Sequence, residues 1–153
     1  MAAVSTEDLA DLLGTTETPA LEFESTAKRE GRRGDAIGNA VCAMANDLAG
    51  IGGGDILIGV DDHGRPIADD VDTSDRALLM LTDLRDDGRV LDRPSLVVRA
   101  ALYQGRPVIH LHVTASATPP IRFEGVVWVR PGPDHPQGHS GGRAGADGAA
   151  ALR

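Results

Sequence analysis

The sequence lacks the features on which several protein classes depend. It has one cysteine, Cys42, among 153 residues, which excludes an intramolecular disulfide framework and a zinc site built from several cysteines. It has no apolar stretch of about 18 residues or longer, so we expect no membrane span. The N-terminus also lacks the basic and apolar regions of a signal peptide. These absences indicate a soluble, cytoplasmic protein without membrane contacts.

Aromatic and basic residues are also scarce. Aromatic residues make up 3% of the chain, so the core must consist of aliphatic side chains, and a base-stacking platform is not expected. The chain has 23 acidic and 15 basic residues and a formal net charge of −8. This charge excludes non-specific binding of DNA or RNA over the whole surface, but it is compatible with a local basic patch.

The residues that are present predict one ordinary domain. Hydrophobic residues make up 41% of the chain, enough to bury a core. Helical periodicity predicts a short N-terminal helix over residues 5–14 and two main helices over 35–48 and 72–85. Apolar runs and the turns between them predict strands and hairpins at 21–25, 56–60, 95–103, 107–113, 121–124 and 126–130. This order predicts an α+β fold with a mixed β-sheet.

Composition divides the chain into three parts. Residues 1–14 are predicted to form an N-terminal helical segment, and residues 15–133 the α+β domain. In residues 134–153, Pro, Gly, Ala and Ser dominate and no hydrophobic period survives, which predicts a disordered tail.

Four short segments follow one another in a distinctive order. They are Glu17–Phe23 (ETPALEF), Ala40–Asn46 (AVCAMAN), Gly52–Asp62 (GGGDILIGVDD) and Pro119–Gly132, which ends in VVWVRPG. In this order and spacing they resemble the Schlafen AlbA_2 domain family, also described as a divergent AAA-4 or RecG-like DNA-binding domain, over roughly residues 15–133. The resemblance implies that the chain binds nucleic acid, either DNA or RNA, in a regulatory or accessory role.

Carboxylates supply an enzymatic alternative. In Schlafen-type ribonucleases, the positions that match Glu17, Glu22 and Asp62 provide a triad for metal-dependent RNA cleavage, and Asp61 is the rival for the third position. The resemblance thus implies an Mg²⁺ or Mn²⁺ site, because these hard cations prefer carboxylate oxygens and can activate water. The residues alone also allow a structural interpretation, with Glu22 on the solvent face of a strand and the two aspartates in a turn.

Two features depart from the family pattern. Glu24 stands where the family usually has Lys, and residues 47–51 fill a gap that is usually shorter. Both departures fall where a ligand is expected to bind. Glu24 and the net negative charge favour a third alternative, in which the chain is a degenerate protein-interaction module.

The glycine-rich segment Gly52, Gly53 and Gly54 allows two interpretations. Backbone amides of such a turn can bind phosphate. The segment lies between a helix and a strand, however, and has no Gly-Lys-Ser/Thr sequence, so a Walker A loop is excluded. The alternative is a helix end followed by a tight turn into the strand.

A basic set is the candidate nucleic-acid-binding surface. Its members are Lys28, Arg29, Arg32 and Arg33 in an expected mobile loop, together with Arg122 and Arg130. Such side chains pair with phosphates and release counterions, which makes affinity depend on salt; the alternative is a solvated loop. Residues 61–92 hold ten Asp and four Arg, so the negative charge is concentrated away from the loop. The chain could also form a homodimer, which would bring two such basic surfaces together.

His110 and His112 lie two residues apart on one predicted strand and therefore share a face. Two such side chains can hold zinc if a third ligand comes from elsewhere. His63, His135 and His139 are the candidates for that ligand. The alternative is a pair of packed or exposed strand histidines without a metal.

Two further side chains are assigned to the core. Cys42 lies on an alanine-rich face of the predicted helix and is expected to be a small buried residue without a catalytic role. Trp128 lies in an alternating strand, where packing in the core is expected, although a tryptophan can also stack on a base.

Overall fold

The computed structural model describes residues 20–25, 36–67, 71–86, 88–103, 105–130 and 150–151. The described elements are two main helices, α2 (Ala36–Asn46) and α3 (Asp75–Asp86), and short and long strands in two sheets. This is the α+β class that the sequence predicts. The predicted helix 5–14 lies outside the described residues.

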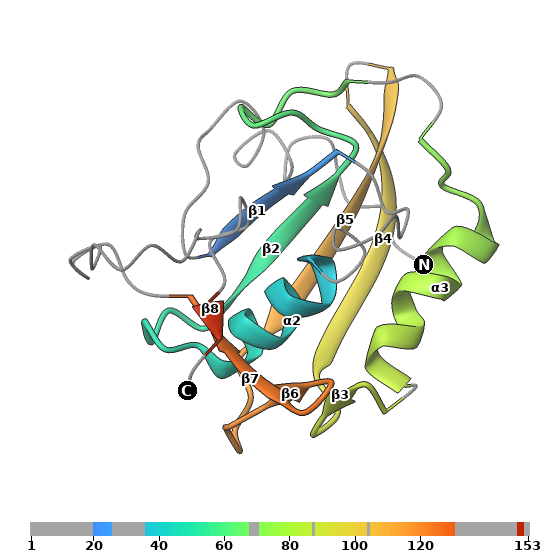
Figure 1. The fold of residues 1–153 in the computed structure, drawn as a ribbon. Helices are drawn as coiled ribbons and strands as arrows, with labels where there is room; N and C mark the ends of the chain where they lie inside the picture. The colour runs from blue at the N-terminus through green and yellow to red at the C-terminus, as the bar shows by residue number, and fades with distance from the viewer. Residues whose placement is uncertain are drawn as a thin grey trace.

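The main sheet has the strand order β1–β2–β5–β4 (Figure 1). Its strands are β1 (Leu21–Glu24), β2 (Gly53–Ile58), β5 (Arg106–Thr114) and β4 (Ser95–Tyr103). β1 and β2 are parallel, whereas β2 with β5 and β5 with β4 are antiparallel, so the sheet is mixed as predicted. Parallel neighbours require a crossover connection, and α2 lies in the connection between β1 and β2.

A second, smaller sheet was not predicted. It has the order β3–β6–β7–β8, formed by β3 (Val90–Leu91), β6 (Arg122–Phe123), β7 (Val126–Val129) and β8 (Ala150–Ala151). The hairpin β6–β7 was expected, but it packs across α2 instead of extending the main sheet. Residues 150–151 belong to the segment that the sequence predicts to be mostly disordered, and they pair with Trp128 and Val129 of β7.

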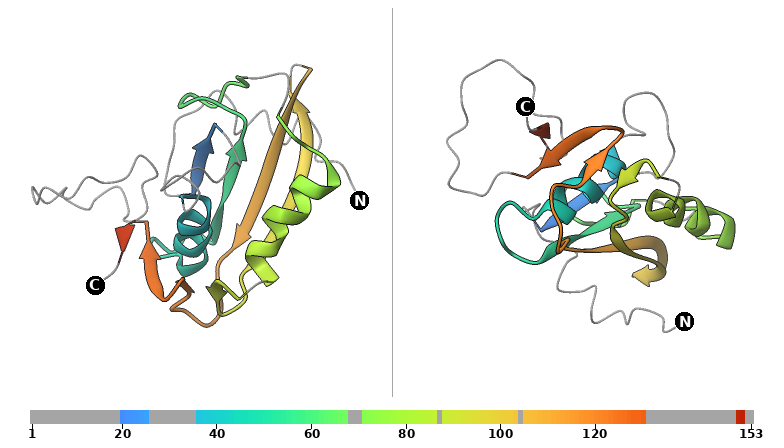
Figure 2. Two further views of the ribbon diagram at one scale, coloured as in Figure 1. Left: turned by 45° about the vertical axis from the view of Figure 1, so that its right-hand side comes forward. Right: turned by 90° about the horizontal axis from the view of Figure 1, so that it is seen from below.

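α2 lies between the two sheets (Figure 2). Nine of its 11 residues are buried, and a helix that is buried on nearly all sides needs small or apolar residues around its whole circumference. The alanines of the sequence AIGNAVCAMAN meet this need. Gly38 allows the closest contact, since a Cβ atom at this position would lie 2.4 Å from the ring of Phe123.

α3 packs beside β4 and begins three residues later than predicted. The Ser74 side chain accepts a hydrogen bond from the amide of Ala77, so Ser74 is the N-cap residue. The buried side chains of α3 are Leu81 and Leu84. No described helix is long and apolar enough to cross a membrane.

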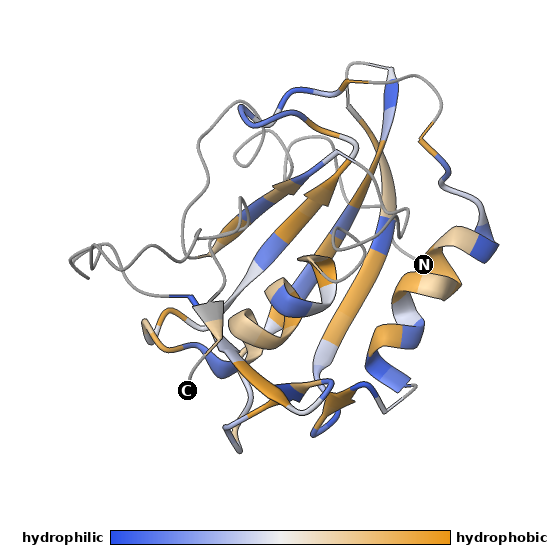
Figure 3. Cartoon of the chain, viewed as in Figure 1, coloured by the Kyte–Doolittle hydropathy of each residue, from blue (hydrophilic) through white to orange (hydrophobic). Residues whose placement is uncertain are grey.

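The main sheet is buried on both of its faces along β2. Ile56 and Ile58 pack with α2 in the larger apolar cluster, whereas Leu57 packs on the opposite face with Leu21 and Phe23. A central strand is confirmed at Ile56–Ile58, whereas β2 ends before residues 59–60 of the predicted strand. Figure 3 shows apolar residues along β2, β5 and β4. We name the face with Leu57 the outer face and the face toward α2 the inner face.

Candidate functional site

The two predicted triad carboxylates that the structure describes lie in different environments. Glu22, opposite Ile56 in the main sheet, is buried and accepts a hydrogen bond from the guanidinium of Arg130. Asp62 is exposed in the turn after β2. Glu17 lies outside the described residues, so the complete triad stays a prediction.

Glu22 differs from its predicted position on the solvent face of a strand. Its side chain is 1% exposed, and Arg130 is 6% exposed. Alternation along β1 is not a guide to solvent here, because α2 and the small sheet cover the inner face. A metal ion held by Glu22 would lie beside a buried guanidinium, which repels a cation.

Asp61, the rival for the third triad position, organises the turn after β2. Its carboxylate accepts hydrogen bonds from the amides of His63, at 2.8 Å, and Arg65, at 3.0 Å. Hydrogen bonds from the Arg65 and His63 backbone lower the pKa of Asp61. The structural interpretation of Asp61 is therefore confirmed, since its oxygen binds the backbone of its own turn.

The glycine-rich segment forms the entry into a strand. Gly53 and Gly54 are the first residues of β2 and are buried, and Gly52 precedes them. Gly53 has a φ of 114°, and a Cβ atom there would lie 2.0 Å from the carbonyl oxygen of Val113. Close backbone approach therefore requires glycine at this position.

The backbone amides of this segment donate hydrogen bonds to the carboxylate of Asp47. Asp47 Oδ1 accepts from the amide of Ile51 at 2.9 Å, and Asp47 Oδ2 accepts from the amide of Gly52 at 2.9 Å. A longer bond of 3.4 Å comes from Gly53. Asp47 belongs to the residues that depart from the family pattern, and its carboxylate lies where a bound phosphate would lie. The geometry supports the helix-end and tight-turn interpretation.

Asn46, the last residue of α2, connects the helix to the small sheet. Its Nδ2 donates to the carbonyl oxygens of Ile121 at 2.9 Å and Trp128 at 2.7 Å, and its Oδ1 accepts from the amide of Ile121 at 2.6 Å. Cys42, one turn earlier, donates its thiol to the same Ile121 oxygen at 3.2 Å. The Cys42 side chain is fully buried, as the sequence predicts. Trp128 is partly buried against the larger core cluster, as expected.

Only part of the predicted basic set can be placed. Lys28, Arg29, Arg32 and Arg33 lie outside the described residues. Arg122 is exposed on β6, where a phosphate can reach it. Arg130 is buried with Glu22, and this position corrects its assignment to a surface set, because its charge is directed into the interior.

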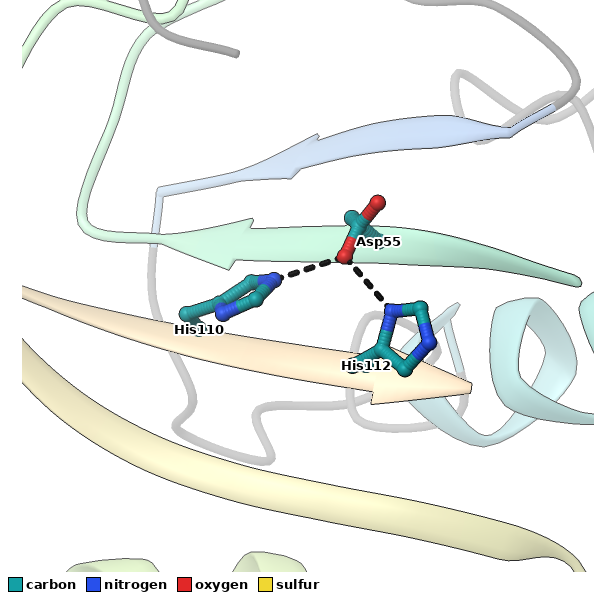
Figure 4. Close-up of side chains that lie close together, drawn as sticks. All are labelled: Asp55, His110 and His112. Carbon is teal, nitrogen blue, oxygen red and sulfur yellow. Dashed lines mark hydrogen bonds and ion pairs between the residues drawn. The ribbon is translucent and has the colours of Figure 1, made fainter. Parts of the chain in front are cut away.

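Asp55, His110 and His112 come together on the outer face (Figure 4). Asp55 lies directly opposite His112 in the pairing of β2 with β5, and His110 lies two residues earlier on the same face. Oδ1 of Asp55 lies 2.7 Å from Nε2 of His110 and 2.9 Å from Nδ1 of His112. Burial opposes ionisation of Asp55, but the hydrogen bonds and charges of both histidines outweigh it and lower the pKa of Asp55.

This cluster adds Asp55 as a candidate third ligand of the histidine pair, which the sequence analysis did not name. His63 is exposed in the turn after β2, and His135 and His139 lie outside the described residues. Among the described residues, Asp55, His110 and His112 form the one group of three side chains with metal-ligand spacing. Asp55 could have been identified from the sequence as a candidate ligand, because it is a charged residue in an otherwise uncharged strand.

Two solved structures are similar to this chain. A protein from Corynebacterium diphtheriae matches with a TM-score of 0.50 and 25% identity over 74% of this chain and 21% of that chain. This chain therefore spans about a fifth of that protein. The N-terminal domain of an ATP-dependent DNA helicase RecG-related protein from Nitrosomonas europaea matches with a TM-score of 0.48 and 18% identity, over 75% of this chain and 74% of that one. A search of curated proteins gave no match.

The sequence profile of the Schlafen AlbA_2 family matches residues 17–137. This match begins at Glu17 and continues through the last strand of the β6–β7 hairpin. It includes the buried pair of Glu22 and Arg130 and the connecting residue Asn46. The chain therefore belongs to the Schlafen AlbA_2 family.

Proposed function

We propose that this chain binds nucleic acid through the basic segment 28–33, with Arg122 as a further contact. Membership of the Schlafen AlbA_2 family carries the proposal. The net charge of −8 makes a local contact surface necessary, because a phosphate backbone is repelled by the protein as a whole.

The strand order supports a separation of charge. β1 and β4 are the two edges of the main sheet. Residues 26–35, which lie outside the described residues, follow the edge strand β1 in the sequence and contain four basic residues. α3 lies beside β4, at the other edge, and the segment 72–92 that contains α3 has six Asp and three Arg.

A salt titration tests the proposal. Fluorescence anisotropy of labelled duplex DNA and single-stranded RNA is measured with the full chain, starting at about 50 mM salt, where electrostatic binding is strong. We expect the logarithm of the association constant to fall linearly with the logarithm of the salt concentration. Absence of binding to either nucleic acid at this salt concentration would contradict the proposal.

Charge reversal tests where the nucleic acid binds. The variant Arg29→Glu, Arg32→Glu, Arg33→Glu should lose most of the affinity, and the salt slope should fall by about 3 if each arginine contacts one phosphate. The matched control, Arg65→Glu, Arg76→Glu, Arg93→Glu, changes the net charge equally at exposed positions elsewhere. An equal loss of affinity in the control would show that binding depends on the net charge of the protein and not on the segment 28–33.

A regulatory or accessory role is part of this proposal, in which the chain would bring other activities to nucleic acid. The expected homodimer stays a prediction. Its measurement is the molar mass by light scattering, alone and with bound nucleic acid, which gives the number of basic segments per complex.

A further inference from the structure

We propose that Asp55, His110 and His112 bind one divalent transition-metal ion of the Zn²⁺ class on the outer face of the main sheet. The proposal is independent of nucleic-acid binding. It begins from the register of β2 and β5, which sets Asp55 opposite His112. Alternation along β5 then brings His110 to the same face.

The chemistry of the three donors selects the class of ion. Two imidazole nitrogens and one carboxylate oxygen suit Zn²⁺ and its neighbours Co²⁺ and Ni²⁺. Mg²⁺ and Ca²⁺ prefer an all-oxygen set. The site therefore differs in place and in preference from the carboxylate triad that the family resemblance implies.

The geometry needs a small adjustment to hold the ion. The donor atoms all lie within 4.8 Å of one another, and Asp55 Oδ1 lies 2.7 and 2.9 Å from the two ring nitrogens. Tetrahedral ligands about 2.1 Å from Zn²⁺ are about 3.4 Å apart. The N···O separations must therefore open by about 0.5–0.7 Å, which is within the reach of side-chain rotation.

The strands beneath the site are rigid, whereas one side of the site is open. Ile56, Leu57, Ile109 and Leu111, which flank the ligands along both strands, are fully buried, and a site on packed strands holds its geometry. The His110 side chain is 13% exposed and Asp55 is 23% exposed, but His112 is 50% exposed. Three protein ligands with one open side leave a fourth position for water or an exogenous ligand.

The neighbouring strands contribute one further charge. β1 places Leu21 opposite Asp55, and β4 places Val97 opposite His112 and Arg99 opposite His110. Before an ion binds, Asp55 and Arg99 balance each other in charge. A bound dication makes the site positive, so an anion or hydroxide suits the fourth position.

Metal binding is measured on the full-length chain after removal of any histidine tag. Competition with a chromogenic chelator should give one Zn²⁺ per chain, and Zn²⁺ should raise the thermal midpoint where equal Mg²⁺ does not. Co²⁺ should give the intense visible absorption of a four-coordinate site. Lack of Zn²⁺ binding, or an equal response to Mg²⁺, would overturn the proposal.

Variants locate the ion. His112→Ala changes a half-exposed side chain and should fold normally, and it should reduce Zn²⁺ affinity at least tenfold. His110→Ala and Asp55→Asn should do the same. The matched controls are His63→Ala and the double variant His135→Ala, His139→Ala, which should bind as the wild type does. Loss of binding in either control, or its retention in His112→Ala, would assign the ion to other residues.

Discussion

Glu22 of β1 and Arg130, which directly follows β7, form an ion pair in the interior of the protein. The two residues are 108 positions apart in the sequence and belong to the first and the last of the segments that resemble the family. Their contact joins the edge strand of the main sheet to the small sheet. The pair thus fixes how the two sheets meet around α2.

Removal of one member of this pair should be costly. Arg130→Met removes the guanidinium from the buried Glu22 carboxylate, and breaking a buried pair in this way typically costs about 3–5 kcal/mol in the free energy of unfolding. Urea unfolding followed by circular dichroism measures the change. Arg122→Met is the matched control, because Arg122 is exposed on β6, and it should change the free energy by about 0.5 kcal/mol or less.

A double variant separates the pair from its surroundings. Glu22→Leu with Arg130→Met removes both charges and should recover a large part of the stability, since an apolar pair can replace a buried ion pair. A loss in Arg130→Met no greater than that in Arg122→Met would show that the pair does not hold the two sheets together.

Asn46 should be more important for stability than its place at a helix end suggests. Asn46→Ala removes the hydrogen-bond partner of the Trp128 carbonyl oxygen and of the Ile121 amide, whereas the Ile121 carbonyl oxygen retains the thiol of Cys42. Each backbone group left without a partner costs about 1–3 kcal/mol, so we expect a loss of about 2–4 kcal/mol. Asn39→Ala on the same helix is the control, because no side-chain hydrogen bond of Asn39 is described. Equal losses in thermal or urea unfolding would refute the connecting role of Asn46.

The elements of the main sheet could be predicted because each depends on local pattern. Helical periodicity placed α2 within two residues of its observed ends, and the hairpin β4–β5 was predicted from its turn. The apolar run 56–60 indicated a strand buried on both faces. The observed β2 begins earlier, at Gly53. A glycine-rich segment resembles a turn in composition, but these glycines allow the close backbone approach that strand pairing requires here.

The candidate site depends on contacts that local pattern does not encode. Alternation shows that His110 and His112 share a face, but not which strand lies beside them. The register of β2 with β5, which brings Asp55 to them, is a long-range property. Burial of Arg130 could not be predicted for the same reason, because its partner Glu22 is distant in sequence and an arginine is usually exposed.

The glycine-rich segment gives a test of anion binding. Asp47 has a φ of 48°, so Asp47→Gly removes the carboxylate without adding backbone strain. The variant should lose about 1–2 kcal/mol in stability. Its free amides should then respond to inorganic phosphate by a rise in thermal midpoint at constant ionic strength, whereas the wild type should show no such rise.

A variant in the next turn controls for the general effect of the substitution. Asp62→Gly removes an exposed carboxylate and should not create a phosphate response. If the wild type itself responds to phosphate, the Asp47 carboxylate does not occupy the anion position, and the phosphate interpretation of Gly52, Gly53 and Gly54 regains support.

Cys42 should make stability depend on alkaline pH. Burial raises the pKa of the Cys42 thiol above its ordinary value of 9.0, although backbone hydrogen bonds with Trp128 and Phe123 oppose the shift. The unfolded thiol therefore ionises at lower pH than the folded one. Its contribution to stability is complete below about pH 9 and is lost as pH rises toward the folded-state pKa, with a slope of up to about 1.4 kcal/mol per pH unit.

Comparison with Cys42→Ala isolates this slope, because the variant retains the other groups that titrate at alkaline pH. Urea unfolding between about pH 8 and pH 10.5, a range that spans the ordinary thiol pKa, should show a steeper loss in the wild type. A thiol reagent should react with the native protein far more slowly than with the unfolded chain, since the side chain is fully buried. Parallel pH profiles together with rapid native labelling would show instead that the Ile121 region opens readily, and that the contacts of Cys42 and Asn46 do not hold α2 against the small sheet.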